Sequence, residues 1–460
     1  MNGIIGWGSY VPRARLDRSA LAAMFQLSGA RGMRSVAGPD EDSLTMGVEA
    51  TRAALTGLDV SPESCWFATS HAPMLDRGNA AVLAAAVDLD DTVGAYDTGG
   101  SIRSGMAAFR AAVAQSGPAL AALADVRFGR PGSDDEANGG DAAAAFVFGP
   151  NPLVEVVSHS TVSSPVMDRW RSEGDIGSST WDDRWTAEHQ VPLVERVVTE
   201  ALKSAGISES DLSVAVVSCP SARAEAQVIA RLGVSIGDTD PRSSIGYSGA
   251  ADVGVRLAAA LDAAGPNQWI LVATGADGAD AMVLKTTTDF VGSANVSRIA
   301  GGNTIEPATY LLWRGLVERA AVRRPPSEAP AAPAVARNEP WKLAFIGSAC
   351  ASCGTRHMPP QRVCLRCQVV DEMEPVVLRD TQATVRTFTI DRLAASINPP
   401  VVVGVLDFDG GGRYRCQMTD VIASDVAVGD RVEMVYRLVA VSNGIRNYFW
   451  KARPVSEEDS

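Results

Sequence analysis

The sequence predicts an α/β module over residues 1–320, followed by a small β-rich module. Strand and helix patterns alternate along the first part, and the same order recurs further along the chain. A segment rich in proline and alanine then interrupts the pattern at residues 321–340. Beyond it lie two closely spaced pairs of cysteines and a series of short β-branched runs. The 460 residues are enough for two or three domains, each with a sizeable core.

The first elements of the N-terminal module follow in the order strand, helix and strand. Met1–Val11 contains a short apolar strand with glycines. Leu44–Leu55 places apolar residues at helical spacing, and Gly57 is suited to end that helix. Cys65–Ala68 is a short apolar run that leads into a polar loop. This alternation is typical of an α/β fold.

The same order returns in the second half of this module. Leu193–Ala205 is predicted to be helical, Gly206 ends it, and Ser213–Val217 is a β-branched strand. A second repeated pattern is an aspartate followed by an apolar run. It occurs at Asp141 and again at Asp280, 139 residues later. Two such echoes predict a duplicated α/β unit. We expect a mostly parallel sheet whose ligands bind in the loops after the strands.

Residues 321–340 have no hydrophobic period and are expected to form a stiff, extended connector. Downstream of it, about five short strands predict a small barrel. The runs that predict them are Ala383–Ile390, Val401–Phe408, Arg413–Met418, Arg431–Val441 and Tyr448–Ala452. A hairpin dipeptide, Asn443-Gly444, joins the last two.

The strongest motif lies between the connector and the barrel. Cys350 and Cys353 form one C-x-x-C pair, and Cys364 and Cys367 form another. Two such pairs place four thiolates around a tetrahedral Zn²⁺ with no open position, which predicts a structural zinc site at residues 341–372. The alternative is free or disulfide-bonded thiols. His357, between the pairs, is interpreted as a surface residue because four thiolates leave it no vacancy.

Composition argues against several classes of protein. The net charge of −13 offers no basic surface for nucleic acid or for an anionic membrane. The sequence has no apolar stretch of about 18 residues and no N-terminal secretion signal, so a cytoplasmic protein is expected. The lysines lie outside any phosphate-binding loop motif, and neither a zinc-protease nor a serine-hydrolase motif is present.

Five stretches of the N-terminal module are similar to those of a known family: Gly3–Pro12, Asp40–Ala50, Trp170–Gly174, Gly246–Asp262 and Tyr310–Gly315. Through them, residues 1–320 resemble the thiolase superfamily and, within it, the hydroxymethylglutaryl-CoA synthases. The resemblance implies a duplicated thiolase-like fold, a CoA thioester as substrate and a homodimer.

The C-terminal module has four further stretches of this kind: the four cysteines with Pro359–Arg362, Asp407–Arg413, Val428–Val432 and Tyr448–Pro454. Through them, residues 341–460 resemble the zinc-ribbon and OB-fold proteins that accompany thiolases and help to admit acyl-CoA. The resemblance implies a zinc ribbon at residues 341–372 and an OB-fold at residues 373–460. A thiolase or a carrier protein is then a candidate partner.

The chain departs from the superfamily at its catalytic residues. The resemblance implies a cysteine nucleophile in the strand-to-helix turn Asp97–Phe109, but Ile102 holds that position. An isoleucine cannot be acylated. The glutamate position falls at about Ser70 and the histidine position at Ser218. The Glu-Cys-His set of the superfamily is therefore missing, and a covalent acyl-enzyme is not expected.

Eight residues remain as candidates for the pocket. We assign catalytic roles to Tyr247, His71, Ser101 and Cys219, and substrate-binding roles to Ser70, Ile102, Arg103 and Ser218. A phenol, an imidazole, a hydroxyl or a thiol can each move a proton or attack a carbonyl group. Each also has a structural alternative. Cys219 and Tyr247 could be core residues, and His71 could be an ordinary loop residue. Ser101 lies one residue before the position of the family's nucleophile, so its side chain could point elsewhere.

Two functions stay open at this point. One is an acyl-CoA or acyl-carrier processing enzyme with a non-standard mechanism, such as acyl transfer or retro-aldol cleavage. The other is a catalytically silent scaffold that binds an acyl thioester or an active thiolase partner. The sequence does not identify the acyl group or its acceptor.

Overall fold

The computed structural model describes residues 3–27, 31–292, 302–320, 324 and 331–455. The chain divides into two compact units. The first comprises residues 1–38, 42–84 and 89–316, and the second comprises residues 39–41, 85–88 and 317–460.

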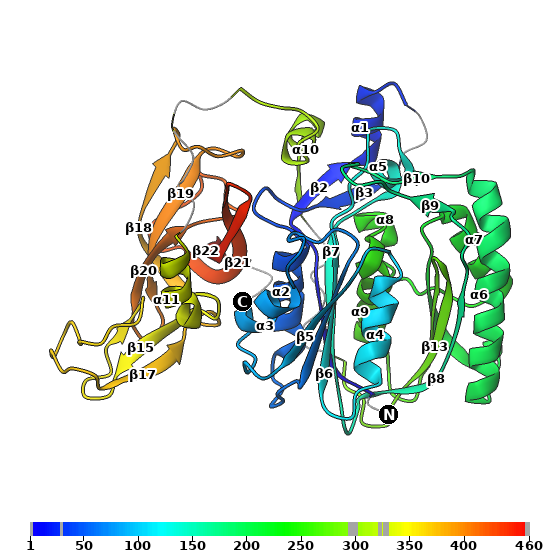
Figure 1. The fold of residues 1–460 in the computed structure, drawn as a ribbon, viewed down its shortest axis with the longest axis horizontal. Helices are drawn as coiled ribbons and strands as arrows, with labels where there is room; N and C mark the ends of the chain where they lie inside the picture. Colours follow the sequence, from blue (N-terminus) through cyan, green and yellow to red (C-terminus); the bar gives the residue numbers. More distant parts are fainter. Residues whose placement is uncertain (1–2, 28–30, 293–301, 321–323, 325–330, 456–460) are drawn as a thin grey trace. The chain divides into compact units, whose positions relative to one another are not determined.

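Within the described residues, a nine-stranded sheet forms the framework of the first unit (Figure 1). Its order is β11 (Leu212–Ser218), β12 (Trp269–Gly275), β13 (Gly278–Thr286), β8 (Val154–Ser163), β1 (Gly3–Tyr10), β7 (Ala142–Gly149), β6 (Ala119–Asp125), β4 (Ser64–Thr69) and β5 (Gly94–Gly99). The pairs β11–β12, β6–β4 and β4–β5 are parallel, and the other neighbours are antiparallel. The prediction of a mostly parallel sheet is wrong, because short connections such as the β12–β13 turn enforce antiparallel pairing.

The duplication predicted from the sequence is confirmed. One half of the sheet has the order β5-β4-β6-β7-β1, the other has the order β11-β12-β13-β8, and the halves pair through Ile4 and Val154. The two echoed aspartates lie at matching places: Asp141 directly before β7, and Asp280 near the start of β13. This is the thiolase-like α/β arrangement that the resemblance implied.

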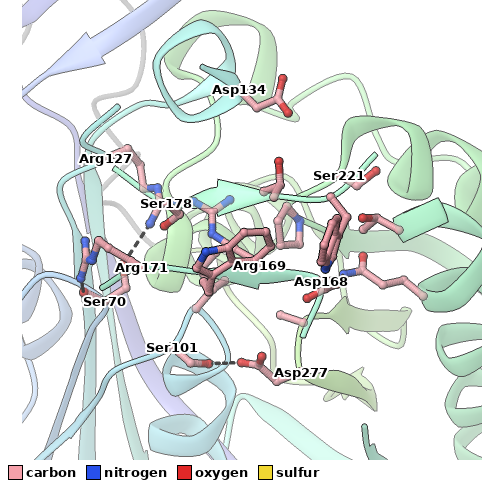
Figure 2. Close-up of a pocket in the computed structure, with 18 of the residues that line it drawn as sticks. Ser70, Ser101, Arg127, Asp134, Asp168, Arg169, Arg171, Ser178, Ser221 and Asp277 are labelled. Carbon is pink, nitrogen blue, oxygen red and sulfur yellow. Dashed lines mark hydrogen bonds between the residues drawn. The ribbon is translucent and has the colours of Figure 1, made fainter. Parts of the chain in front are cut away.

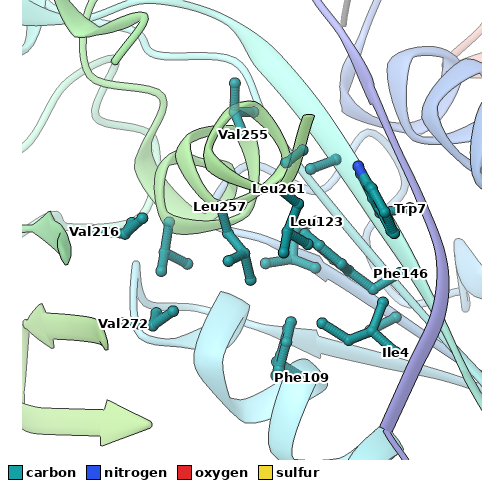
Figure 3. Packing of buried hydrophobic residues seen from close by; sticks show 14 of the residues in the cluster. Ile4, Trp7, Phe109, Leu123, Phe146, Val216, Val255, Leu257, Leu261 and Val272 are labelled. Carbon is teal, nitrogen blue, oxygen red and sulfur yellow. The ribbon is translucent and has the colours of Figure 1, made fainter. Parts of the chain in front are cut away.

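Four helices complete the layers of this unit (Figure 1). They are α2 (Ser43–Leu55) and α6 (Asp183–Ala205) on the outer faces, and α4 (Ser104–Val113) and α9 (Asp252–Asp262) between the halves. Figure 3 shows Phe109 of α4 and Leu257 of α9 packed among Ile4, Phe146 and Val272 from both halves. Buried apolar side chains from both halves therefore hold the two central helices, and the loops at their ends are positioned by this core.

The helix predicted at Leu193–Ala205 begins ten residues earlier, at Asp183. Asp182 caps it by accepting from the backbone N–H groups of residues 184 and 185, and the buried residues keep a helical period on both sides of Pro192. Packing against β8 and β13 compensates for the hydrogen bond that the proline cannot donate. Gly206 ends the helix in the left-handed region, as predicted.

The remaining described elements of the first unit are short. The helices are α1 (Arg18–Met24), α3 (Ala80–Ala86), α5 (Asp134–Asn138), α7 (Ala222–Leu232), α8 (Arg242–Ile245) and α10 (Pro307–Trp313), with single 3₁₀ turns at Glu209–Asp211 and Gly249–Ala251. Two small sheets contain β2 (Ala14–Asp17), β3 (Met33–Val36) and β14 (Asn303–Thr304), and β9 (Arg169–Trp170) with β10 (Ser179–Thr180). No described helix has both the length and the apolar character needed to cross a membrane.

In the second unit, a three-stranded ribbon of β16 (Arg356–His357), β15 (Ile346–Cys350) and β17 (Met373–Val377) precedes a barrel. The barrel contains β20 (Arg413–Gln417), β19 (Val401–Phe408), β18 (Ala383–Asp391), β21 (Arg431–Ser442) and β22 (Ile445–Pro454), in that order. A bridge between Met418 and Ala452 links its two ends. The five predicted strands and the Asn443-Gly444 turn are confirmed.

The extended connector predicted at residues 321–340 is wrong for its last part. Residues Ala332–Lys342 form the helix α11, with Pro333 in the first turn. Proline is tolerated there, and alanine, arginine and glutamate favour the helix. Residues 321–323 and 325–330 lie outside the described residues.

Candidate functional site

A pocket with about 1010 Å³ of empty volume, including the part open to solvent, lies in the first unit. The loops after β4, β5 and β11, the β9–β10 segment and the β12–β13 turn all line it. Figure 2 shows Ser70, Arg127 and Arg171 together on one side of the pocket, and Ser101 with Asp277 on another. Both halves of the duplicated fold therefore contribute to one site.

The first side of the pocket is built on a buried carboxylate. Asp125 ends β6, and its Oδ2 accepts hydrogen bonds from Ser70 Oγ at 2.6 Å and from the backbone N–H of Ala250 at 3.0 Å. His71 Nδ1 lies 3.1 Å from Ser70 Oγ and 3.7 Å from Asp125 Oδ1. Because the single proton of the Ser70 hydroxyl goes to Asp125, His71 Nδ1 donates to Ser70.

This geometry sets the charges of Asp125 and His71. Burial alone would raise the pKa of Asp125, but the adjacent His71, the charge of Arg127 and the hydrogen bond from Ser70 lower it to about 2. Burial lowers the pKa of His71 below its ordinary value, although Asp125 opposes this shift. At neutral pH, Asp125 is therefore ionised and His71 is neutral, with a lone pair on Nε2.

Three arginines surround this pair. Arg127 Nη1 donates to Ser70 Oγ at 2.9 Å, and its Nη2 donates to Asp135 Oδ1 at 2.8 Å. Arg169 also donates to Asp135. Arg171, beside β9, donates to the Ser70 carbonyl at 2.9 Å and to His71 Nε2. The guanidinium of Arg171 therefore covers the nitrogen that has the free lone pair.

The other side of the pocket contains Ile102, at which the resemblance implies a cysteine. Ile102 lines the pocket two residues before the start of α4 and exposes a hydrocarbon side chain to the cavity. Ser101 Oγ donates to Asp277 Oδ2 and accepts from the backbone N–H of Arg103 at 3.0 Å. Ser101 is thus a pocket residue with a carboxylate partner.

Three of the candidate site residues, Arg103, Ser218 and Cys219, are not among the described residues that line the pocket. Arg103 forms an ion pair with Asp280 at 2.8 Å. Ser218 is buried and donates to Asp252 at 2.8 Å. Cys219 is fully buried among apolar side chains, and burial raises the pKa of its thiol to about 12. A thiol in this state is a poor nucleophile.

Tyr247 is also outside the described pocket lining. Its side chain is 3% exposed, its ring lies 4.5 Å from the Arg242 guanidinium carbon, and its hydroxyl has no hydrogen-bond partner among the described residues. Burial raises the pKa of Tyr247 above its ordinary value, and nearby Asp252 adds to the shift. The phenol is therefore held in its neutral form.

Sequence reasoning missed Asp125, Arg127, Arg171 and Asp277. A signal existed for the first, since Asp125 is the polar end of a strand that is otherwise apolar. Arg171 and Asp277 come from irregular segments, where hydrophobic periodicity gives no information on direction.

The predicted metal centre lies in the second unit. The ligand atoms of Cys350, Cys353, Cys364 and Cys367 all lie within 4.8 Å of one another, and they are the whole of this metal-ligating cluster among the described residues. The Sγ atoms of Cys350 and Cys367 are 3.5 Å apart. Tetrahedral Zn–S bonds of about 2.3 Å require edges of about 3.8 Å, so the four thiols fit a structural zinc ion.

His357 is buried, with 6% of its surface exposed, so its interpretation as a surface residue is wrong. It is part of β16, which pairs with β15 through Ser348. This pairing carries the side chain into the interior of the ribbon without bringing it into the cysteine cluster.

Comparison with known families identifies both parts of the second unit. Residues 343–374 match the family described as ChsH2, rubredoxin-like zinc ribbon domain. Residues 376–437 match the ChsH2, C-terminal OB-fold domain. The zinc ribbon and the OB-fold predicted from the sequence are therefore confirmed.

The first unit is similar in sequence to curated synthases. The hydroxymethylglutaryl-CoA synthase of Pyrococcus furiosus is 30% identical over 299 residues, which cover 60% of this chain and 83% of that protein. The chain belongs to the hydroxymethylglutaryl-CoA synthase family. Another member, from Methanosphaera stadtmanae, is 27% identical over 63% of this chain and 89% of its own length.

Solved structures agree with this family fold. An HMG-CoA synthase complexed with CoA has a TM-score of 0.60 at 13% identity and covers 72% of this chain and 94% of its own. The 3-oxoacyl-(acyl carrier protein) synthase III of Pseudomonas aeruginosa has a TM-score of 0.55 at 21% identity, over 62% of this chain and 98% of its own. The thiolase-like fold is therefore shared across both groups.

Proposed function

We propose that the first unit binds an acyl thioester of CoA or of a carrier protein in the pocket, and that His71 catalyses its reaction by acid and base chemistry. Acyl transfer to a small acceptor and retro-aldol cleavage are the two reactions that we consider. The observation that carries this proposal is the arrangement of Ser70 and Asp125 behind His71, which orients a neutral imidazole at the pocket edge.

Relatives support the choice of substrate class. One solved synthase is complexed with CoA, and the curacin HMG synthase is in complex with acetyl donor-ACP. A covalent acyl-enzyme is not part of the proposal, because Ile102 occupies the nucleophile position and Cys219 is buried.

The retro-aldol case shows how His71 could act alone. Neutral Nε2 removes the proton of a β-hydroxyl group, whose oxygen becomes a carbonyl as the bond between the α and β carbons breaks. The electron pair passes to the α carbon as a thioester enolate, and the imidazolium returns the proton to it. Arg171 must leave Nε2 before this reaction begins.

The proposal is tested by incubating the protein with a series of 3-hydroxyacyl-CoA thioesters. Chromatography measures product formation, and intact-protein mass spectrometry detects any acyl adduct. We expect product from the wild type, no acyl adduct, and a loss of about a hundredfold for His71→Gln. Arg196→Gln, an exposed residue of α6, is the matched control. Equal rates for His71→Gln and the wild type, or an adduct on Ser101, would overturn the mechanism.

The second candidate is a scaffold that binds the thioester without turnover. The hydrocarbon at Ile102 and the guanidinium over His71 Nε2 favour it. Binding of acyl-CoA with no product from any acyl-CoA in the series would select this function.

For the domain boundaries along the chain, we propose a thiolase-like domain at residues 1–320, a linker at residues 321–340, a zinc ribbon at residues 341–372 and an OB-fold at residues 373–460. Zn²⁺ would hold the ribbon together, and the two modules would help to admit the acyl thioester or a partner protein. A homodimer is also expected. Size-exclusion chromatography with light scattering, at several protein concentrations, tests the dimer.

A further inference from the structure

The carboxylates of the pocket differ in burial. Four belong to its described lining, and three of them are exposed: Asp134, Asp183 and Asp277. Water screens the charges of these three. The fourth, Asp168, is buried, with 7% of its surface exposed. A buried carboxylate needs a counter-charge or several donors in place of water, so the partners of Asp168 decide whether it is balanced.

Asp168 has a neutral partner and no basic one. Its Oδ2 accepts a hydrogen bond from Gln190 Nε2, and no arginine, lysine or histidine among the described residues forms an ion pair with it. Gln190 is itself only 3% exposed, and its Oε1 has no hydrogen-bond donor in the described part of the chain. Both side chains line the pocket. A buried carboxylate without a counter-ion and a buried amide oxygen without a donor thus lie side by side, and each carries a desolvation cost.

The arginines of the pocket do not supply the missing charge. Arg127 and Arg169 both pair with Asp135, a buried carboxylate outside the described lining. Arg171 is exposed, so solvent screens its charge. The described lining as a whole has four carboxylates and three guanidinium groups, and two of those guanidinium groups are already paired outside it. The pocket therefore has surplus negative charge, and a bound ligand is the available source of a cation for Asp168.

Two tryptophans lie beside this carboxylate. The backbone N–H of Trp181 donates to the Asp168 carbonyl at 3.2 Å, and its Nε1 donates to the Met167 carbonyl at 2.8 Å. The rings of Trp170 and Trp181 have their centroids 5.2 Å apart, and both residues line the pocket. The face of an indole attracts a cation that lies within about 6 Å of the ring. A carboxylate, an amide oxygen and indole rings are together suited to bind an organic ammonium ion.

We infer that Asp168 and Gln190 bind an alkylammonium group of the substrate, and that Trp181 packs against the carbon atoms next to it. This inference rests on the proposed acyl-thioester pocket and adds the chemical class of its substrate. The acyl chain or the small acceptor carries the ammonium group. Figure 2 shows Asp168 across the pocket from Ser70, the partner of His71, so the ammonium group anchors the substrate and does not react.

Calorimetric titration of the full chain with matched thioesters tests an ammonium group on the acyl chain. β-Alanyl-CoA differs from butyryl-CoA only in a terminal ammonium in place of a methyl group, and 6-aminohexanoyl-CoA differs from heptanoyl-CoA in the same way. Titration with n-butylammonium, with and without bound butyryl-CoA, tests an ammonium group on the acceptor, and 1-butanol is its neutral match. We expect at least one ammonium compound to bind about tenfold more tightly than its neutral match.

Three variants connect this preference to the site. Asp168→Asn should abolish it, leave the affinity for the neutral thioesters within about twofold, and keep or raise the melting temperature, because an unbalanced buried charge is removed. Trp181→Leu, at a position that is 58% exposed, should reduce the preference by about threefold. Asp238→Asn makes the same change in net charge at an exposed position and should keep the whole preference.

Other results would overturn the inference. A preference that persists in Asp168→Asn would show that the ammonium group binds elsewhere. If the wild type bound the neutral thioesters and preferred no ammonium compound, the inference alone would be rejected. Absence of binding for every acyl-CoA would reject the proposed function, whereas n-butylammonium binding that is lost in Asp168→Asn would still support the ammonium site.

Discussion

Ser70 Oγ donates a 2.6 Å hydrogen bond to Asp125 Oδ2, and the carboxylate that accepts it is fully buried at the end of β6. A buried charge is tolerated only where hydrogen bonds and counter-charges replace water. Ser70, Arg127 and the backbone of Ala250 supply them here. The pocket edge and the stability of the unit therefore depend on the same carboxylate.

Replacing Asp125 by asparagine should destabilise the first unit. The change removes the charge that balances Arg127, and loss of one partner of a buried ion pair costs about 3 kcal/mol. Urea unfolding followed by circular dichroism measures this loss. Asp238→Asn, at an exposed position, should change the free energy of unfolding by less than about 0.5 kcal/mol. A similar small change in Asp125→Asn would contradict the structure.

The contribution of Asp125 should also depend on pH. Its pKa is lowered to about 2 in the folded protein, below the ordinary value of 3.8, so ionised Asp125 favours the folded state. The difference in stability between the wild type and Asp125→Asn should be fully present above about pH 4. It should fall as the pH drops from about 4 to about 2, and a constant difference over that range would be evidence against the lowered pKa.

Turnover should rise with pH and reach a plateau if His71 acts as the base. Burial lowers the pKa of His71 below its ordinary value of 6.5, so the midpoint of the rise should lie below pH 6.5. A profile of turnover against pH from 4.5 to 8 at saturating substrate measures this midpoint. His71→Gln should lose the rise along with about a hundredfold in rate. A midpoint at or above 6.5 would point to another group.

Tyr247→Phe distinguishes catalysis from packing. The Tyr247 hydroxyl is buried without a partner among the described residues, so its removal should leave the melting temperature unchanged or raise it by a few degrees. Turnover should stay within about twofold, because the phenol lies outside the described pocket lining. A large loss of rate with an unchanged melting temperature would restore Tyr247 as a catalytic residue.

A cysteine at position 102 should be reactive. Ile102→Cys places a thiol in the pocket two residues before the start of α4, and helix N-termini lower the pKa of nearby thiols. Iodoacetamide labelling of the native protein, with peptide mapping, should show rapid modification at residue 102. Cys219 should stay unlabelled in the same sample, because it is fully buried. Labelling of Cys219 at a similar rate would show that the pocket reaches it.

Removal of zinc should act on the ribbon alone. The zinc-loaded protein should contain one zinc ion for each chain, and Cys364→Ser should lose it. With a chelator, hydrogen exchange should accelerate across residues 346–377, since the four thiolates connect the loops of this segment. The strands β6 and β12 should keep their protection, and an equal loss in both units would show that they do not fold independently.

The sequence was sufficient for the elements whose side chains show a clear period. Both the helix at Leu44–Leu55 and the strand at Val401–Phe408 agree with the structure within a residue. Antiparallel pairing was missed because parallel and antiparallel buried strands share the same apolar pattern. The start of α6 was missed because a proline such as Pro192 usually marks a helix boundary. In the structure, packing keeps the helix continuous through Pro192.

Part of the candidate site was predictable from the loops that follow strands. Ser70 and His71 follow β4, Ser101 and Ile102 lie in the loop after β5, and all four line the pocket. Cys219 directly follows β11 and Tyr247 follows α8, but both are buried, because packing from distant segments decides whether a side chain turns into the core. Arg171 reaches the site from a segment 100 residues beyond His71 in the chain, a relationship that no local pattern contains.

The hydrogen bond from Ala250 to Asp125 has a consequence for how this chain could have evolved. Ala250 belongs to the second copy of the repeat and Asp125 to the first, so a single copy would leave the acid without one of its anchors. An ancestor with a single copy would have needed to form a homodimer to supply both residues of this hydrogen bond. After fusion, the two copies could diverge in sequence. If the two halves were expressed as separate chains, each should be inactive until the halves associate.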